Sequence, residues 1–100
     1  MELFRGDTFY KSVTAGDYIF QPDDVLRVAI FNNTIDETKL YENEIKVTEE
    51  TSSILVEIPA SKTKELKPGI LVLEFELTYG KGVVKTEQHE LLVKADGIHE

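Results

Sequence analysis

The feature that most constrains this chain is a hairpin signature over residues 66–93. Leu66-Lys67-Pro68-Gly69 reads as a turn, and residues 70–79 form a long run that alternates apolar and polar side chains from Leu73 onward. Gly80-Lys81-Gly82 then reverses the chain before a second run over 83–93. Period-two alternation places one set of side chains on each face of a strand. One face of the first strand carries Leu71, Leu73, Phe75, Leu77 and Tyr79, and the other carries Glu74, Glu76 and Thr78. The pattern predicts a small antiparallel β domain.

Turn signals divide the rest of the chain into shorter strands, because Gly, Pro, Asn, Asp and Ser cluster between alternating runs. The expected strands cover residues 2–5, 8–13, 25–32, 40–47 and 53–58. Pro59 ends the last of them, since it cannot donate to a β-ladder, and residues 60–66 read as one short helical turn. About seven strands and no long helix predict an all-β, antiparallel β-sandwich. We expect an immunoglobulin-like architecture, although the Cys…Trp…Cys hallmark of antibody domains is missing.

The length of 100 residues predicts one domain, with the sandwich over residues 1–94 and a flexible tail over 95–100. The chain has no cysteine, which excludes disulfides and Cys-based zinc sites. No apolar run approaches the ~20 residues of a membrane span, and residues 1–5 do not resemble a signal peptide. We therefore expect no membrane association. Because small secreted domains often rely on disulfides, the absence of cysteine favours an intracellular location or an assembly such as a virus particle.

The formal net charge of −8 argues against nucleic-acid binding, since 19 acidic residues face 11 lysines and arginines. A solvated, self-repelling surface explains the imbalance. The alternative is a negative face that steers a basic partner.

Two candidate chemical sites have plainer explanations. Glu87 and His89 share one strand face, but no third metal ligand is evident, and His99 falls in the expected tail. Glu74 and Glu76 project from one face roughly 7 Å apart, which suits glycoside hydrolysis, but a flat strand face offers no cleft. Pairing with Lys81, Lys85 or another cross-strand lysine is the simpler use. We expect no catalytic residue, no metal and no cofactor.

Two short motifs are also weak. Arg5-Gly6-Asp7 is a tripeptide that some adhesion receptors read, but a strand end with a tight turn explains it equally. Asn32-Asn33-Thr34 matches a glycosylation sequon, but without a recognisable secretion signal we do not expect the chain to meet the glycosylation machinery.

The chain resembles the small immunoglobulin-like modules of phage and prophage tail and baseplate proteins. The likeness begins with Leu3-Phe4-Arg5-Gly6-Asp7-Thr8-Phe9 and returns near the end, in Thr63 to Gly69, the long strand 71–79, the Gly80–Gly82 turn and the closing strand. One departure is Gln21-Pro22-Asp23-Asp24, where such modules carry a longer Gly-x-Pro-x-Asp-Leu-Thr-Gly link. The resemblance implies a non-enzymatic structural or docking role, with tail or baseplate proteins as partners and a location in a virion or the bacterial cytoplasm.

Shared parity in four strands predicts one buried layer, made of Leu26, Val28, Ile30, Ile54, Val56, Leu71, Leu73, Phe75 and Leu77. Phe31, Ile70 and Val72 have the opposite parity and are left over. The segments 60–66 or 18–20 would cover them, or they form a patch for a protein partner or for self-association.

A carbohydrate-binding or adhesive surface domain is the alternative function. Sugar sites use exposed aromatic side chains, and Phe31 and Tyr41 are the candidates here.

Overall fold

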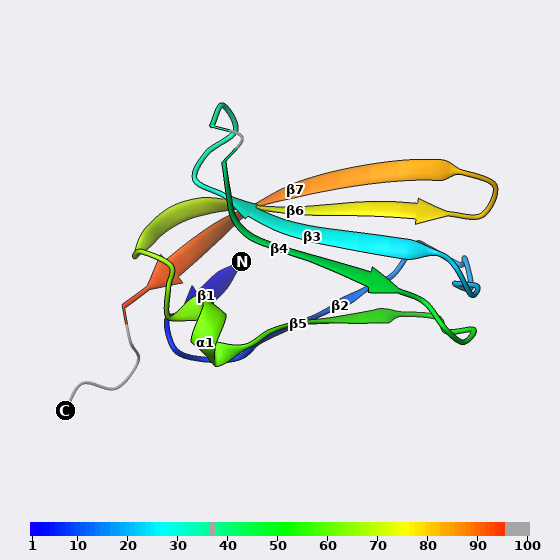
Figure 1. Ribbon diagram of the computed structural model, residues 1–100, viewed down its shortest axis with the longest axis horizontal. Helices are drawn as coiled ribbons and strands as arrows, with labels where there is room; N and C mark the ends of the chain where they lie inside the picture. The colour runs from blue at the N-terminus through cyan, green and yellow to red at the C-terminus, as the bar shows by residue number, and fades with distance from the viewer. Residues whose placement is uncertain (37, 96–100) are drawn as a thin grey trace.

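The computed structural model describes residues 1–36 and 38–95. Within them lie seven strands and one helical turn, close to the predicted positions (Figure 1). The elements are β1 (Glu2–Phe4), β2 (Phe9–Val13), β3 (Val25–Phe31), β4 (Lys39–Lys46), β5 (Ile54–Ile58), α1 (Ala60–Thr63), β6 (Gly69–Tyr79) and β7 (Val83–Lys94). The all-β prediction is confirmed, whereas most of the predicted tail, His99 included, lies outside the described residues.

The strands form a curled five-stranded sheet, in the order β1-β7-β6-β3-β4, and a two-stranded sheet of β2 and β5. Figure 1 shows the small sheet lying along one side of the large one. The expectation of a wholly antiparallel fold is wrong at one place, because β1 pairs with β7 in parallel, from Glu2 opposite Leu92 to Phe4 opposite Lys94. A parallel neighbour is reached only through a long crossover, and here almost the whole chain separates the two strands.

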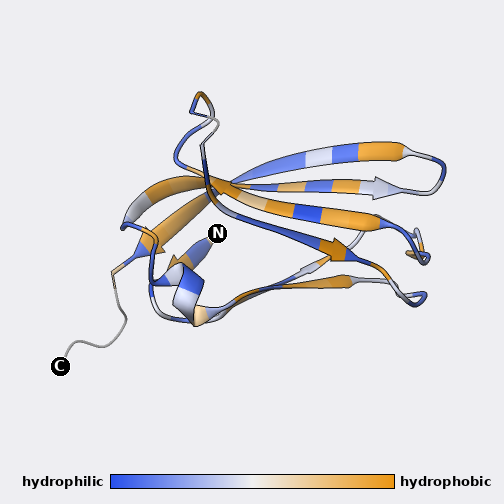
Figure 2. Cartoon of the chain, viewed as in Figure 1, coloured by the Kyte–Doolittle hydropathy of each residue, from blue (hydrophilic) through white to orange (hydrophobic). Residues whose placement is uncertain are grey.

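The core lies between the two sheets and combines side chains from both. Every residue of the predicted buried layer is buried, so that prediction is confirmed. Figure 2 shows the alternation as successive bands of apolar and polar residues along β6, whereas β3 is apolar apart from one polar band, at Arg27. Phe20 and Leu66 also join this cluster. The side of the large sheet that faces away from β2 and β5 is called the outer face below.

A buried carboxylate joins the loops at one end of the molecule. Asp24 is 5% exposed, and its Oδ2 accepts hydrogen bonds from the Tyr18 hydroxyl and the Gln21 amide, both at 2.9 Å. Its Oδ1 accepts from the amide of Gly80 in the β6–β7 turn, at 3.2 Å. One side chain therefore ties the segment before β3 to the tip of the hairpin.

These hydrogen bonds decide the charge state of the carboxyl. Burial acts to raise the pKa of Asp24, but donation from Gln21, Tyr18 and Gly80 outweighs burial, and the pKa lies below its ordinary value. The same contact works in reverse on the phenol, since burial and the neighbouring Asp24 carboxylate raise the pKa of Tyr18.

Replacing Phe75 with alanine tests the core. Phe75→Ala removes a buried ring and leaves a cavity, so the free energy of unfolding should fall by about 3–5 kcal/mol in urea titrations. Glu76→Ala, one position along on the outer face, is the matched control and should change stability by no more than about 0.5 kcal/mol. A Phe75→Ala protein that melts within about a degree or two of wild type would show that the register is wrong.

Replacing Asp24 with asparagine tests the buried carboxylate. Because the folded-state pKa is depressed, its stabilisation is complete above the unfolded-state value near 3.9 and is lost as pH falls through the folded-state pKa. Asp24→Asn should therefore lower the free energy of unfolding by about 1–3 kcal/mol at pH ~7. The gap between variant and wild type should narrow below pH ~4. Asp17→Asn, on an exposed side chain, is the control, and a gap that does not change with pH would contradict the argument.

Candidate functional site

The Arg5-Gly6-Asp7 tripeptide is used inside the fold. The Arg5 guanidinium donates to the carbonyl of Lys64 at 2.8 Å, and Gly6 has a φ of +83°, which suits glycine. The fully buried Thr63 hydroxyl accepts from the Gly6 amide at 3.1 Å and lies 2.8 Å from the Asp7 carbonyl, to which it donates. The tripeptide therefore joins β1 to α1 through the side chain of Arg5 and the backbone of Gly6 and Asp7.

The Glu87/His89 pair lies on exposed β7. Glu87 is 3.6 Å from the Lys85 ammonium and 3.5 Å from Nε2 of His89. The His89 ring also makes an edge contact with Phe75, at a centroid separation of 5.9 Å. Among the described residues no three His, Cys, Asp or Glu side chains gather closely enough to hold a metal ion.

The two glutamates of β6 lie on the outer face, as predicted, but their expected pairing with Lys85 is wrong. Lys85 lies opposite Leu77 and so belongs to the inner face, where it contacts Glu87. Glu74 instead accepts a hydrogen bond from the Gln88 amide at 2.9 Å.

The three residues of the predicted patch meet on the outer face. Phe31 of β3 lies opposite Val72 of β6, and Ile70 lies two residues before Val72 on the same face. Ile70 is 64% exposed, while Phe31 and Val72 are half-buried. The suggested covers do not reach them, because Phe20 and Leu66 are buried in the core on the other side of the sheet.

The structure adds two residues that the sequence analysis missed. Leu92 lies opposite Ile70, and Phe4 of β1 lies one step further along the same face, 39% exposed with the Lys94 ammonium 5.4 Å from its ring centroid. The place of Leu92 follows from the β6–β7 hairpin that the sequence predicts. The place of Phe4 is not visible in the sequence, because it depends on the parallel β1–β7 pairing. We call Phe4, Phe31, Ile70, Val72 and Leu92 together the outer patch.

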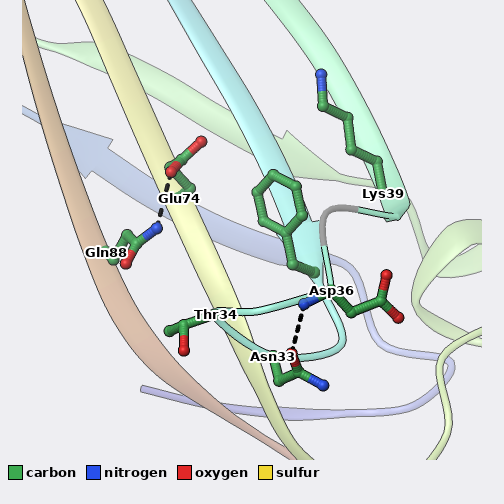
Figure 3. Close-up of a pocket in the computed structure, with 7 residues that line it drawn as sticks. Asn33, Thr34, Asp36, Lys39, Glu74 and Gln88 are labelled. Atoms are coloured by element: carbon green, nitrogen blue, oxygen red, sulfur yellow. Dashed lines mark hydrogen bonds between the residues drawn. The ribbon is translucent and has the colours of Figure 1, made fainter.

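A shallow pocket of about 320 Å³ adjoins the outer patch (Figure 3). Phe31 lines it together with polar side chains of two kinds. The loop that follows β3 contributes Asn33, Thr34 and Asp36, and the strands of the sheet contribute Lys39, Glu74 and Gln88. The Asn33 carboxamide oxygen accepts from the amides of Ile35 at 2.8 Å and Asp36 at 2.6 Å, which shapes the loop. Hydrogen bonds from Thr38 lower the pKa of Asp36. The sequon Asn32-Asn33-Thr34 lies in this exposed loop.

Tyr41, the second aromatic candidate for sugar binding, faces inward. It lies opposite Ile30 and packs against the core, and burial raises the pKa of its phenol. Phe31 is therefore the one of the two that borders the pocket.

None of the helical segments in residues 1–36 and 38–95 is long and apolar enough to cross a membrane. Comparisons with protein-family models, curated proteins and solved structures found no match to this chain.

Metal titration tests the ionic contacts at Glu87 and His89. We expect neither calcium nor zinc to bind there. Because a ligand raises the melting temperature only when it binds the native state, both ions should leave that temperature unchanged. A saturable rise at micromolar zinc that Glu87→Gln and His89→Gln both abolish would instead establish a metal site on β7.

Proposed function

We propose that this protein is a non-enzymatic structural module that acts through protein–protein contacts, as a component of a phage or prophage tail or baseplate assembly. In this proposal the two sheets form an immunoglobulin-like sandwich. The resemblance of the opening and closing segments to such modules supports the assignment, and so does the β-rich architecture.

The observation that carries the proposal is the outer patch. Five apolar side chains from four strands lie side by side at one end of the outer face. Contiguous apolar surface of this kind marks protein interfaces, since burying it yields roughly 25 cal/mol for each Å².

The surroundings of the outer patch also fit a protein interface, which typically has an apolar centre and a polar rim. Glu2 and Lys94 form an ion pair at 3.2 Å beside Phe4, and exposed Glu90 lies opposite Val72. These charges would remain solvated at the edge of a contact while the apolar centre loses water.

One observation favours carbohydrate binding as a second candidate. The pocket beside Phe31 presents an aromatic ring next to carboxylate, carboxamide and ammonium groups, which together can bond sugar hydroxyls while the ring covers a sugar face.

A binding experiment tests the proposed function. The partners to try are the products of genes that flank this one, which the proposal expects to encode tail or baseplate proteins. The double substitution Phe31→Glu/Val72→Glu should weaken binding at least about a hundredfold, because it buries two uncompensated charges. Fluorescence anisotropy or surface plasmon resonance would measure the change.

The matched control adds the same charge elsewhere, in Ser12→Glu/Thr78→Glu, and should bind like wild type. Equal binding by the patch variant and wild type would contradict the proposal. Binding to a glycan array that Phe31→Ala abolishes, with no flanking protein bound, would favour the carbohydrate alternative.

A further inference from the structure

Most of β7 forms an open edge of the large sheet. β6 lies along one side of it from Val83 to Val93, while β1 covers the other side only from Leu92 to Lys94. Within the described part of the chain, residues 83–90 have no strand on that side (Figure 1). Val84, on this stretch, is 58% exposed. An unpaired run of this length is a template for another strand.

The backbone groups that face this edge follow from the bonds to β1. Leu92 donates its amide to Met1 at 2.8 Å, Glu90 accepts from the Met1 amino group at 3.1 Å, and Lys94 accepts from the Arg5 amide at 3.0 Å. Even-numbered residues of β7 therefore direct their N–H and C=O groups away from β6. Because this direction alternates along a strand, the amides and carbonyls of Val84, Thr86 and Gln88 point out of the open edge.

We propose that this edge pairs with the same edge of a second copy of the chain, antiparallel, with Thr86 opposite Thr86 of the copy. In this register Val84 meets Gln88 of the copy, so outward-pointing backbone groups face one another and form the hydrogen-bonded pairs. Lys85 then lies opposite Glu87 of the copy in the closer, non-hydrogen-bonded pair, and the two-fold axis creates this contact twice.

The side chains of Lys85 and Glu87 already lie where they could form these contacts between the two copies. The Lys85 ammonium lies 3.6 Å from the Glu87 carboxylate within one chain, so both reach the same region of the inner face. Charged residues on an edge strand discourage pairing with strands in general. On β7 the order of the charges instead complements a second copy of itself, and a Debye length of about 8 Å at physiological ionic strength screens the repulsion between two acidic molecules.

The other long edge of the large sheet lacks this complementarity. In a two-fold antiparallel pair, opposing residues share one face and one hydrogen-bonding direction, so they have the same parity. Registers of this kind that pair most of β4 with itself place Glu42 opposite Glu42 or Glu44 of the copy. Like charges directly opposite each other destabilise a strand pair. The charge pattern therefore selects β7 as the self-pairing edge.

Pairing through β7 goes beyond the proposed function, because it determines how the outer patches are presented. The large sheet would run continuously through both copies. Cross-strand neighbours share a face, so the two outer faces, each with its outer patch, would lie on the same side of the dimer. A partner with two matching sites could then bind both copies at once.

Sedimentation equilibrium over about micromolar to about millimolar protein tests the proposal. Wild type should form dimers. Lys85→Glu and Glu87→Lys should each weaken dimerisation by about tenfold or more, since each puts like charges opposite one another twice. The exchanged double variant Lys85→Glu/Glu87→Lys should restore it. Thr86→Pro should abolish it, because proline lacks the amide that donates to the second copy in the proposed pairing. The monomer does not use this amide in its own sheet.

Lys46→Glu on β4 is the control and should dimerise like wild type. Circular dichroism melting checks folding, and the charge series remains decisive if Thr86→Pro does not fold. A wild type that stays monomeric throughout, or reversals without effect, would overturn the proposal. A dimer that only Phe31→Glu/Val72→Glu abolishes would overturn it too and would identify the outer patch as the self-contact. The experiment with flanking gene products has a separate readout, so the two proposals fail independently.

Discussion

The alternation of side chains along β6 is the constraint on which the rest of the structure depends. β6 pairs with β3 on one side and with β7 on the other, so it sets the register of the large sheet. Its inward residues, from Leu71 to Leu77, supply a large part of the core, and its outward residues include two members of the outer patch. A shift of one residue would exchange those two faces. The core and the candidate contact surface are therefore fixed by the same pairing.

Two buried polar side chains hold the irregular segments against this framework. Asp24 gathers donors from the segment before β3 and from the β6–β7 turn, and Thr63 bonds both Gly6 and Asp7 from the single turn of α1. Each is almost completely removed from water, so its hydrogen bonds must be made within the protein. Apolar contacts determine which strands pack together, whereas these two groups determine where the connecting chain runs.

The sequence predicted the parts of the fold that depend on local pattern. Strand positions and the buried layer follow from alternation and turn residues, and both agree with the structure to within a residue or two. The parallel pairing of β1 with β7 could not be predicted, because a strand of three residues carries too little pattern to specify its neighbour. The same gap hid Phe4 from the candidate site, while Phe31, Ile70 and Val72 were accessible through parity. Leu92 was accessible through the pairing of the β6–β7 hairpin, which places it opposite Ile70. The predicted pairing of Lys85 with the β6 glutamates was wrong for a related reason. The partner of a surface charge depends on which face of the sheet its side chain occupies, and Lys85 lies on the inner face, next to Glu87.

The outer patch and the open edge of β7 are two surfaces that differ in physical character, and polar contacts lie on the outer face beyond the patch. Between the outer patch and the far end of the sheet lie Glu74 bonded to Gln88, and Arg27 3.5 Å from Glu44. Such exposed contacts add little stability, but they keep the middle of the face hydrated. The outer patch offers apolar side chains, whereas the open edge of β7 offers backbone groups and paired charges. Because the two surfaces use different interactions, one can be occupied without competing with the other, and a rigid sheet can connect two contacts without any change of conformation.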